Sequence, residues 1–559
     1  MQHTLFAAGD SVAHLAQTFQ ADTLAVANNT WLTALVGTLP LVAFFIFLMT
    51  LKWKAHTSAI GAVVVSLVLA IFVFGMPVSY SIASLGQGIA FGLFPVVFII
   101  WMAVWLYDLT VSSNRFEDLR LIFSKIGRGD MRVQAMLIGF SFGGLLEALA
   151  GFGAPVAIVA AMLLSLGMKP MKAIITTLVA NTAPVAFGAM AIPVTTAALL
   201  TGLDQREVAG MAGLLMAMIA IIVPFILTFV MDGVRGFKQV WPMALVLGVS
   251  FGGGQYLASN FFSYELTDVV ACLLSLAIGI GFLRVWKPTT PEDQASQVDT
   301  SRANEMDGKR TFLALFPYLL VVIVFAIAKL WAIGINIPKA LASTDVKFQW
   351  PVIGGHLLNP DGSEVTGTLY NFNWLSNPGT LLFISGLITV AVYSAYASKA
   401  FPMSFGQGFG DLGNGAYKMR FSALTIASVM GLAYVMNYSG QTAAIGAALA
   451  TAGTVFPLIS PILGWVGTAV TGSATSSNAL FAKMQATAAG EIGANPVLLT
   501  AANSGGAVIG KMFSPQTLTI AATAVHMENG ESKIMRKVFP YSMGLLAYIC
   551  IVVFLFSLA

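Results

Sequence analysis

Glu147 and Lys511 are ionisable side chains that lie deep inside apolar stretches of this chain. A charged side chain at the centre of a membrane helix costs about 2.5–3.5 kcal/mol on insertion scales, so such residues usually serve an ion or a solute. The Glu147 carboxyl is our candidate for proton coupling. The Lys511 ammonium is our candidate for holding a carboxylate through a charge-assisted hydrogen bond. Two other interpretations stay open: Glu147 as a structural acid held by backbone N–H groups, and Lys511 as its ion-pair partner.

Both residues belong to glycine-rich interruptions of the apolar sequence. The interruptions are Glu147–Pro155 and Asn181–Ala198 in the first half of the chain, and Thr471–Asn478 and Asn503–Thr519 in the second half. Unpaired backbone N–H and C=O groups cannot face lipid, so such breaks survive only where they are buried in protein or line a wet cavity. Helix N-termini at the breaks would present free N–H groups, which attract a small anion such as a carboxylate.

The polar side chains at these breaks are suited to binding a small polar solute. The predicted solute-binding set is Gly151, Phe152, Asn181, Thr182, Ser473, Thr475, Ser476, Ser477, Asn478, Asn503, Ser504 and Lys511. The alternative for its serines and threonines is that they join helix to helix or cap their own turns. For Lys483, which follows this polar run, we expect a structural role, with its ammonium reaching toward the membrane surface.

The two later interruptions match each other residue by residue at one constant offset. The matched pairs are Asn181 with Asn503, Gly188 with Gly510, Met190 with Met512 and Pro193 with Pro515. The flanking loops have opposite charge: Met168–Lys172 is basic, whereas Glu491–Pro496 contains no base. Because Lys and Arg of short loops stay on the cytoplasmic side, this predicts two inverted structural repeats with broken helices or re-entrant hairpins. Paired interrupted segments of this kind point to a transport site.

The composition is that of an integral membrane protein. Of the 559 residues, 57% are hydrophobic and 9% are charged, against a charged share of about 25% in soluble domains. The net charge of +4 is small and gives no reason to expect a nucleic acid as a partner. Cys272 and Cys550 both lie in apolar stretches, so we expect inert packing, with no metal site and no cofactor.

The hydrophobic windows and loop charges predict an all-α polytopic membrane protein. We expect about twelve full crossings and two hairpins, with both termini outside the cytoplasm. The predicted division of the chain is an extracytoplasmic segment at 1–30, a first membrane repeat at 31–231 with a hairpin at 134–167, connecting helices and a cytoplasmic linker at 232–310, and a second repeat at 311–559 with a hairpin around 458–490.

These features favour a secondary transporter over other membrane proteins. The chain contains no HExxH, Walker A or serine-hydrolase motif, so we predict that it is not an enzyme. A channel is the second alternative, but a channel does not need two inverted broken segments with a buried acid. Coupling to sodium in place of a proton stays open.

Several motifs at and near the breaks carry a family resemblance. They are Ala150-Gly151-Phe152-Gly153-Ala154-Pro155, Asn181-Thr182-Ala183-Pro184-Val185-Ala186-Phe187-Gly188, Asn437-Tyr438-Ser439-Gly440, Thr471-Gly472-Ser473 and Gly510-Lys511-Met512. In these motifs, and over nearly its whole length, the chain resembles the bacterial lactate permease family. The resemblance implies import of lactate, and often glycolate, with a proton across the bacterial inner membrane. It also implies inverted repeats, and by wider analogy an elevator-type motion and a homodimer. The chain differs from the family pattern at Lys483, where a small or polar residue is usual, and in its central linker.

Overall fold

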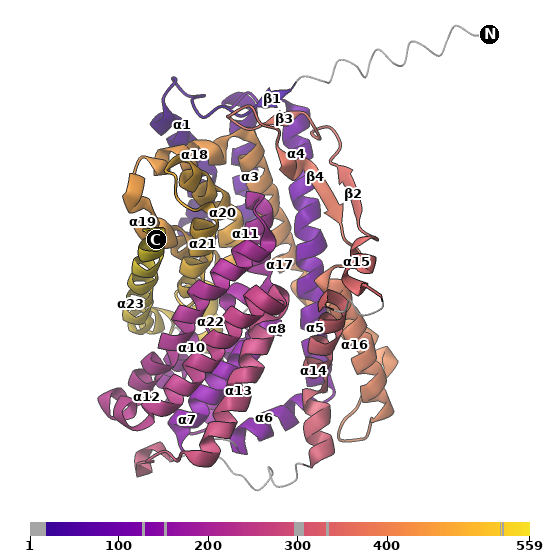
Figure 1. Ribbon diagram of the computed structural model, residues 1–559, viewed down its shortest axis with the longest axis vertical. Helices are drawn as coiled ribbons and strands as arrows, with labels where there is room; N and C mark the ends of the chain where they lie inside the picture. Colours follow the sequence, from indigo (N-terminus) through magenta and orange to yellow (C-terminus); the bar gives the residue numbers. More distant parts are fainter. Residues whose placement is uncertain are drawn as a thin grey trace, which may run out of the picture.

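The computed structural model describes residues 18–125, 129–149, 154–295, 307–330, 335–525, 527 and 530–558. Within these residues the chain is mostly helical, and ten helices are long and apolar enough to cross a membrane. The expectation of a helical polytopic membrane protein is therefore confirmed. The strands lie at one end of the molecule, and helices α6 (Arg115–Lys125) and α7 (Met131–Met136) lie at the other (Figure 1).

The expected number of crossings, about twelve, differs from the ten helices found in the described part, and α12 accounts for part of this. This helix runs 53 residues from Gln205 to Leu257 but leaves helical geometry at Asp232 and Gly233. At about 1.5 Å per residue it is roughly 80 Å long, more than twice the hydrocarbon thickness of a bilayer. The helix therefore counts once but is long enough for two crossings, one on each side of the bend.

The helices form two bundles that lie against each other. In the first bundle the long helix α17 packs on α3, α4 and α5, and α5 packs on α16. In the second, α21 packs on α19, α20 and α12, and α12 packs on α13. Figure 1 shows α5, α14 and α16 on one side and α19, α21 and α23 on the other. The first bundle contains α3 (Ala55–Phe72), α4 (Val78–Phe91), η3 (Gly92–Val97), α5 (Phe98–Ser112), α14 (Gly308–Leu330), α16 (Pro378–Ala395) and α17 (Phe405–Ser439). The second contains α7, η4 (Leu137–Phe142), α8 (Gly143–Leu149), α9 (Ala154–Ser165), α10 (Pro170–Ala180), η5 (Val185–Phe187), α11 (Gly188–Thr201), α12, α13 (Thr267–Val285), α18 (Gln441–Ala450), α19 (Phe456–Thr471), α20 (Ala474–Glu491), α21 (Pro496–Lys511), α22 (Pro515–Ala524) and α23 (Glu531–Ser557).

The remaining elements are the helical stretch Thr30–Thr50, which is one of the ten long enough to cross a membrane, and short elements between the longer helices. Strand β1 pairs in parallel with β3, and β2 pairs antiparallel with β4, so the N-terminal segment and the long loop before α16 share one face. These elements are α1 (Thr30–Gly37), α2 (Leu39–Phe45), η2 (Ile46–Thr50), η6 (Ala258–Phe262), η7 (Tyr264–Leu266), η8 (Glu292–Gln294), α15 (Ile337–Ala342), η10 (Thr366–Thr368), η11 (Gly453–Val455), β1 (Phe19–Gln20), β2 (Val346–Gln349), β3 (Leu357–Leu358) and β4 (Leu369–Phe372).

The two halves of the chain are interrupted at different places. In the first half, α10 ends before Asn181, and the helical segment that follows, Val185–Thr201, is bent from it by 62°. Inside this segment the backbone is left-handed at Ala189–Ala191, with φ of +46°, +61° and +62°. In the second half, α21 runs unbroken through Asn503 and stops at Lys511. The expectation that both asparagines sit at matching breaks was therefore wrong. Pro184 cannot continue a helix, whereas the glycines that follow Asn503 can.

Glycines bring α19 and α21 into close contact and so fix the second hairpin. A Cβ atom on Gly506 would overlap the carbonyl oxygen of Pro461, and one on Gly464 would overlap that of Asn503. No larger residue fits at either point unless the backbones separate. The turn between α19 and α20 is made by Gly472, whose φ is +74°. The tip of this hairpin is thus held rigidly against α21.

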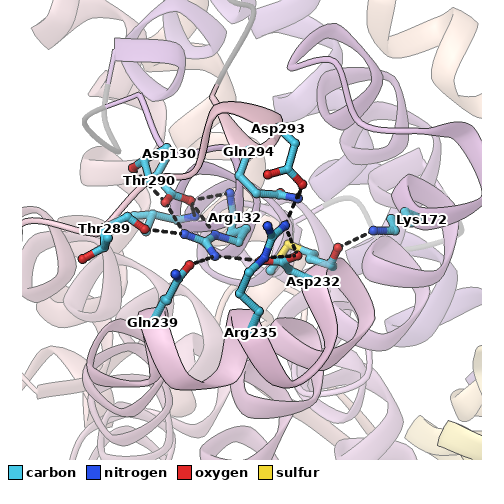
Figure 2. A network of polar contacts seen from close by, with 12 residues as sticks. Asp130, Arg132, Lys172, Asp232, Arg235, Gln239, Thr289, Thr290, Asp293 and Gln294 are labelled. Carbon is cyan, nitrogen blue, oxygen red and sulfur yellow. Dashed lines mark hydrogen bonds and ion pairs between the residues drawn. The ribbon is translucent and has the colours of Figure 1, made fainter.

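A buried ionic network holds the base of the first hairpin (Figure 2). The Arg132 side chain is fully buried and donates to Asp130 at 2.7 Å and to Asp232 at 2.8 Å. It also donates to Gln239 at 2.6 Å and to the carbonyl oxygen of Thr289 at 2.9 Å. The guanidinium therefore joins the start of α7, the bend of α12 and the segment after α13.

The exposed end of this network continues from Asp232 through Arg235 to Asp293, with an Arg235–Asp293 distance of 2.6 Å. Hydrogen bonds from Arg235 lower the pKa of the Asp293 carboxyl. Both side chains are substantially exposed, so this outer pair is screened by water and adds little to stability. The buried contacts of the network carry its structural role.

Candidate functional site

Glu147 and Lys511 form a buried ion pair between the two halves of the chain. Lys511 Nζ, at the end of α21, donates to Glu147 Oε1 in α8, and the two side chains are 8% and 3% exposed. Asn181 Nδ2 donates to the other carboxylate oxygen at 3.1 Å. Both oxygens of the carboxylate therefore have a donor, and its negative charge is balanced by the lysine. This is the pairing that the sequence left open for Lys511.

The ion pair forms part of the wall of a cavity of about 230 Å³. The first bundle contributes the start of α3 and the middle of α17 to this wall, and the second bundle contributes α11 and the tip of the second hairpin. The lining residues are Ala55, His56, Ile100, Glu147, Val185, Gly188, Ala189, Ile192, Pro193, Phe421, Ser422, Thr425, Ile426, Thr471, Gly472, Ser473, Ala474, Thr475, Ser476, Lys511 and Gln516. The cavity thus lies between the two bundles, beside the breaks.

The hairpin tip presents a helix N-terminus and hydroxyl groups to this cavity. Ser473 caps α20, accepting a hydrogen bond from the Ser476 N–H at 3.2 Å. The first N–H groups of a helix have no partner within the helix and carry a partial positive charge, which favours an anion. This end of α20 lies on the cavity wall with the Glu147–Lys511 pair, in which the two charges balance each other. Such a wall suits a small carboxylate.

Two glycines leave space for polar side chains of the cavity wall. Gly472 has a left-handed conformation, and a Cβ there would lie 2.6 Å from Gln516 Oε1. A Cβ on Gly188 would lie 3.1 Å from Glu147 Oε1, closer than an ordinary contact. Glycine at both positions therefore keeps the carboxylate and the amide in place.

The structure divides the predicted residues into two groups. Glu147, Lys511, Ser473, Thr475 and Ser476 line the cavity together. Among the described residues, the cavity wall does not include the other predicted polar side chains, which are Asn181, Thr182, Ser477, Asn478, Asn503 and Ser504. Asn181 does not line the cavity, but it donates a hydrogen bond to Glu147, which does. Gly151 and Phe152 lie outside the described residues.

Most of the second group forms a buried hydrogen-bond network behind the hairpin tip. Asn478 Nδ2 donates to Ser504 Oγ at 2.9 Å and to the carbonyl oxygen of Pro193 at 2.7 Å. Asn503 Nδ2 donates to Asn478 Oδ1 at 2.7 Å, and Ser477 Oγ donates to the carbonyl oxygen of Gly464. These contacts tie α20 to α11, α19 and α21. They position the cavity wall without facing it.

Sequence reasoning missed some of the lining residues. Ser422 and Thr425 lie in the middle of α17, an unbroken helix, so no local signal distinguishes them. Gln516 belongs to the last interruption and could have been included, since it is an amide directly after Pro515. His56, at the start of α3, also lines the cavity, where its ring stacks on Phe421 with 5.0 Å between centroids.

Comparisons with known proteins show the family of this chain. The chain is 37% identical to the glycolate permease of Escherichia coli (strain K12), over 92% of this chain and 93% of that protein. It is 37% identical to the L-lactate permease of Bacillus subtilis (strain 168), over 95% of this chain and 97% of that protein. A solved structure, the YdaH transporter of Alcanivorax borkumensis, aligns with a TM-score of 0.45 at 16% identity, covering 85% of this chain and 88% of that one. The family model described as L-lactate permease matches residues 33–558, and the chain belongs to this family of multi-pass membrane permeases.

Proposed function

We propose that this protein is a secondary transporter that imports lactate, and related 2-hydroxy monocarboxylates such as glycolate, with a proton across the bacterial inner membrane. The names of its relatives support the solute class. The observation that carries the proposal is the buried Glu147–Lys511 pair on the wall of a cavity with a helix N-terminus. A site of this kind can exchange one carboxylate for another.

The ion pair supplies a direct coupling between solute and proton. When a solute carboxylate binds Lys511 and the start of α20, Glu147 loses its cation. A buried charge left without its partner costs about 3–5 kcal/mol, and uptake of a proton by Glu147 removes this cost. One anion and one proton then occupy the site, with no change in net charge. Release of the solute lets Glu147 recover Lys511 and lose its proton, so each ligand favours the binding of the other.

Hydroxyl groups around the bound carboxylate account for a preference for 2-hydroxy acids. Thr471, Ser473, Thr475, Ser476 and Gln516 all line the cavity and can bond a hydroxyl on the carbon next to the carboxylate. A site that hydrogen-bonds a substrate hydroxyl rejects the analogue without it, because its own polar groups are left unpaired. Propionate should therefore compete far less well than lactate or glycolate.

Alternating access in this proposal is a movement of one bundle against the other. The cavity has walls from both bundles, while both members of the ion pair belong to the second bundle. An elevator-type shift of the second bundle along the first would carry the site from one membrane face to the other. The two inverted repeats, the extracytoplasmic position of both termini and a homodimeric assembly belong to the same proposal.

Uptake of labelled lactate into proteoliposomes tests the proposal, with pH and sodium gradients imposed separately. An inward proton gradient should drive accumulation, and a membrane potential should add nothing because the transported pair is neutral. Accumulation driven by sodium at equal pH, without a response to protons, would replace the proton with sodium. Steady ion current without solute would indicate a channel.

Glu147→Gln has a matched control in Asp268→Asn. Asp268 is 1% exposed; one oxygen accepts from Gln255 Nε2 at 2.8 Å, and the other has no hydrogen-bond partner among the described residues. A carboxyl buried without a cation is neutral, so its amide is a close substitute. Glu147→Gln should abolish uphill uptake while lactate exchange persists, and Asp268→Asn should transport as the parent does. If the two variants behave the other way round, Asp268 is the proton carrier.

A further inference from the structure

A second, smaller cavity lies farther along α20, near the loop that precedes α16. Its volume is about 80 Å³, and its wall includes Lys483 of α20, Thr201 at the end of α11, Asn437 and Tyr438 of α17, and Asn359 of the loop. Lys483 follows Ser473 by ten positions, which at about 1.5 Å per residue places it roughly 15 Å along the helix from the first cavity. The two cavities are therefore separate sites on the same helix.

Lys483 lines this cavity, and among the described residues its ammonium group makes one hydrogen bond. Its Nζ donates to the carbonyl oxygen of Thr201 at 3.3 Å, and among the described residues it has no carboxylate partner within ion-pair distance. An ammonium has three N–H donors, so two of them remain for a ligand. A cation that is partly buried without a counter-ion is unfavourable. The structure places this side chain on the wall of the cavity, and the structural role expected for it stays a prediction.

The rest of the cavity wall contains both apolar and polar side chains. Leu199, Leu200 and Val365 line it together with Asn437, Tyr438 and Asn359. Tyr438 OH donates to Gln87 Oε1 at 3.3 Å, and Gln87 Nε2 donates to the carbonyl oxygen of Gly367 at 2.9 Å. These bonds join the end of α17 to α4 and to the loop. The wall thus combines one positive charge with the amide groups of two asparagines, which is suited to a small anion.

We propose that this second cavity is an outer binding site for a small carboxylate, of the same class as the transported solute. The inference rests on the proposed function, and it places the site on the outer side of the second hairpin. Here Lys483 neutralises the carboxylate and the neighbouring amides orient it. A solute molecule held here is concentrated beside the path to the first cavity before the bundles move. Removal of the positive charge should weaken capture from this face only.

The test compares Lys483→Met with Lys483→Arg in proteoliposomes of known orientation. Initial rates of labelled lactate uptake are measured against external concentration in chloride-free sulfate buffer at a fixed proton gradient. Lys483→Met should raise the KM at the outer face at least tenfold and leave the maximal rate within about twofold of the parent, since ten-fold in affinity corresponds to one lost charge-assisted contact. Lys483→Arg should stay within about threefold of the parent. The KM at the opposite face should not change in either variant.

Lys483→Cys provides a second measurement if the methionine variant does not fold. Treatment with 2-aminoethyl methanethiosulfonate returns an ammonium to this position and should restore the low KM, whereas neutral methyl methanethiosulfonate should not. Cys272 and Cys550 are buried, so they are poor targets for the reagent. The untreated cysteine variant should behave as Lys483→Met.

Three results would overturn the inference. An unchanged outer KM in Lys483→Met means that the cavity does not bind the solute, and an equal rise at both faces means that the substitution acts on the first cavity or on the fold. A rise in the parent's outer KM with added chloride, absent in Lys483→Met, means that the site holds an inorganic anion. In all three cases the parent still takes up lactate with protons. If the parent itself shows no such uptake, the proposed function fails instead.

Discussion

Removing the Glu147–Lys511 pair as a unit should be tolerated better than removing either member alone. The two side chains are 3% and 8% exposed, so a substitution of either one alone leaves the other buried away from bulk water. Glu147→Gln strands a buried ammonium, and Lys511→Met strands a buried carboxylate that keeps, among the described residues, the Asn181 amide as its one hydrogen-bond donor. The double variant contains no uncompensated charge.

The size of the effect follows from this burial. Breaking a buried pair by removing one partner costs about 3–5 kcal/mol, whereas replacing the whole pair with uncharged groups is often close to neutral. The double variant should therefore cost at least about 3 kcal/mol less than the sum of the two single variants. A coupling of about 3 kcal/mol is more than a hundredfold in the unfolding equilibrium.

Denaturant titration of the four proteins in detergent micelles measures this coupling, with unfolding followed by loss of helical signal. Asp268→Asn serves as the control for replacing a buried carboxyl that has no lysine partner, and its cost should be independent of Lys511. Additive single and double variants would refute the pairing, because two residues that do not interact cannot share a coupling energy. Proton-driven accumulation should stay absent in the double variant even where stability returns.

Three further predictions follow from the same geometry. Gly188→Ala should lower lactate uptake about tenfold and lower the stability of the fold by about 1–3 kcal/mol through overpacking, because the added Cβ would lie 3.1 Å from Glu147 Oε1; uptake equal to the parent would show that the carboxylate position is not critical. Arg132→Met should lower the stability of the fold by about 3–5 kcal/mol, since it leaves Asp130 and Asp232 buried without their shared cation, and a denaturation midpoint at the parent's value would contradict this. The apparent affinity for lactate should fall up to about tenfold per unit rise in pH, because one proton binds with each solute; in Glu147→Gln the affinity should not depend on pH.

The sequence identified the two charged residues of the candidate site but not their pairing. Glu147 and Lys511 were recognisable because a charge inside an apolar stretch is costly wherever the helices lie. Their pairing depends on how α8 and α21 pack, and these helices are far apart in the chain. Only the tertiary structure brings the two side chains together, so the sequence could name this contact as an alternative but could not choose it.

The polar run after Gly472 shows where local reasoning stopped. Ser473 and Ser476 belong to the first turn of α20, which meets the cavity, whereas Ser477 and Asn478 point into the contact with α19, α21 and α11. Adjacent residues of α20 can differ in this way because a helix has about 3.6 residues in each turn, so that successive side chains point in different directions. The start of α20 could not be located from the sequence, so every polar residue of the run was predicted to bind the solute.

Asymmetry between the halves bears on how many solute carboxylates the proposed site would hold. By the constant offset of the matched residues, Lys511 corresponds to Ala189. Ala189 is the first of three left-handed residues in α11 and carries no charge, whereas Lys511 ends an unbroken helix and reaches across to Glu147. A lysine in both halves would offer two cations to the cavity and would hold a second anion, leaving the single acid unable to balance the charge. With one lysine and one acid, one carboxylate displaces one carboxylate and one proton restores neutrality, so the unmatched lysine sets the proposed ratio of solute to proton at one to one.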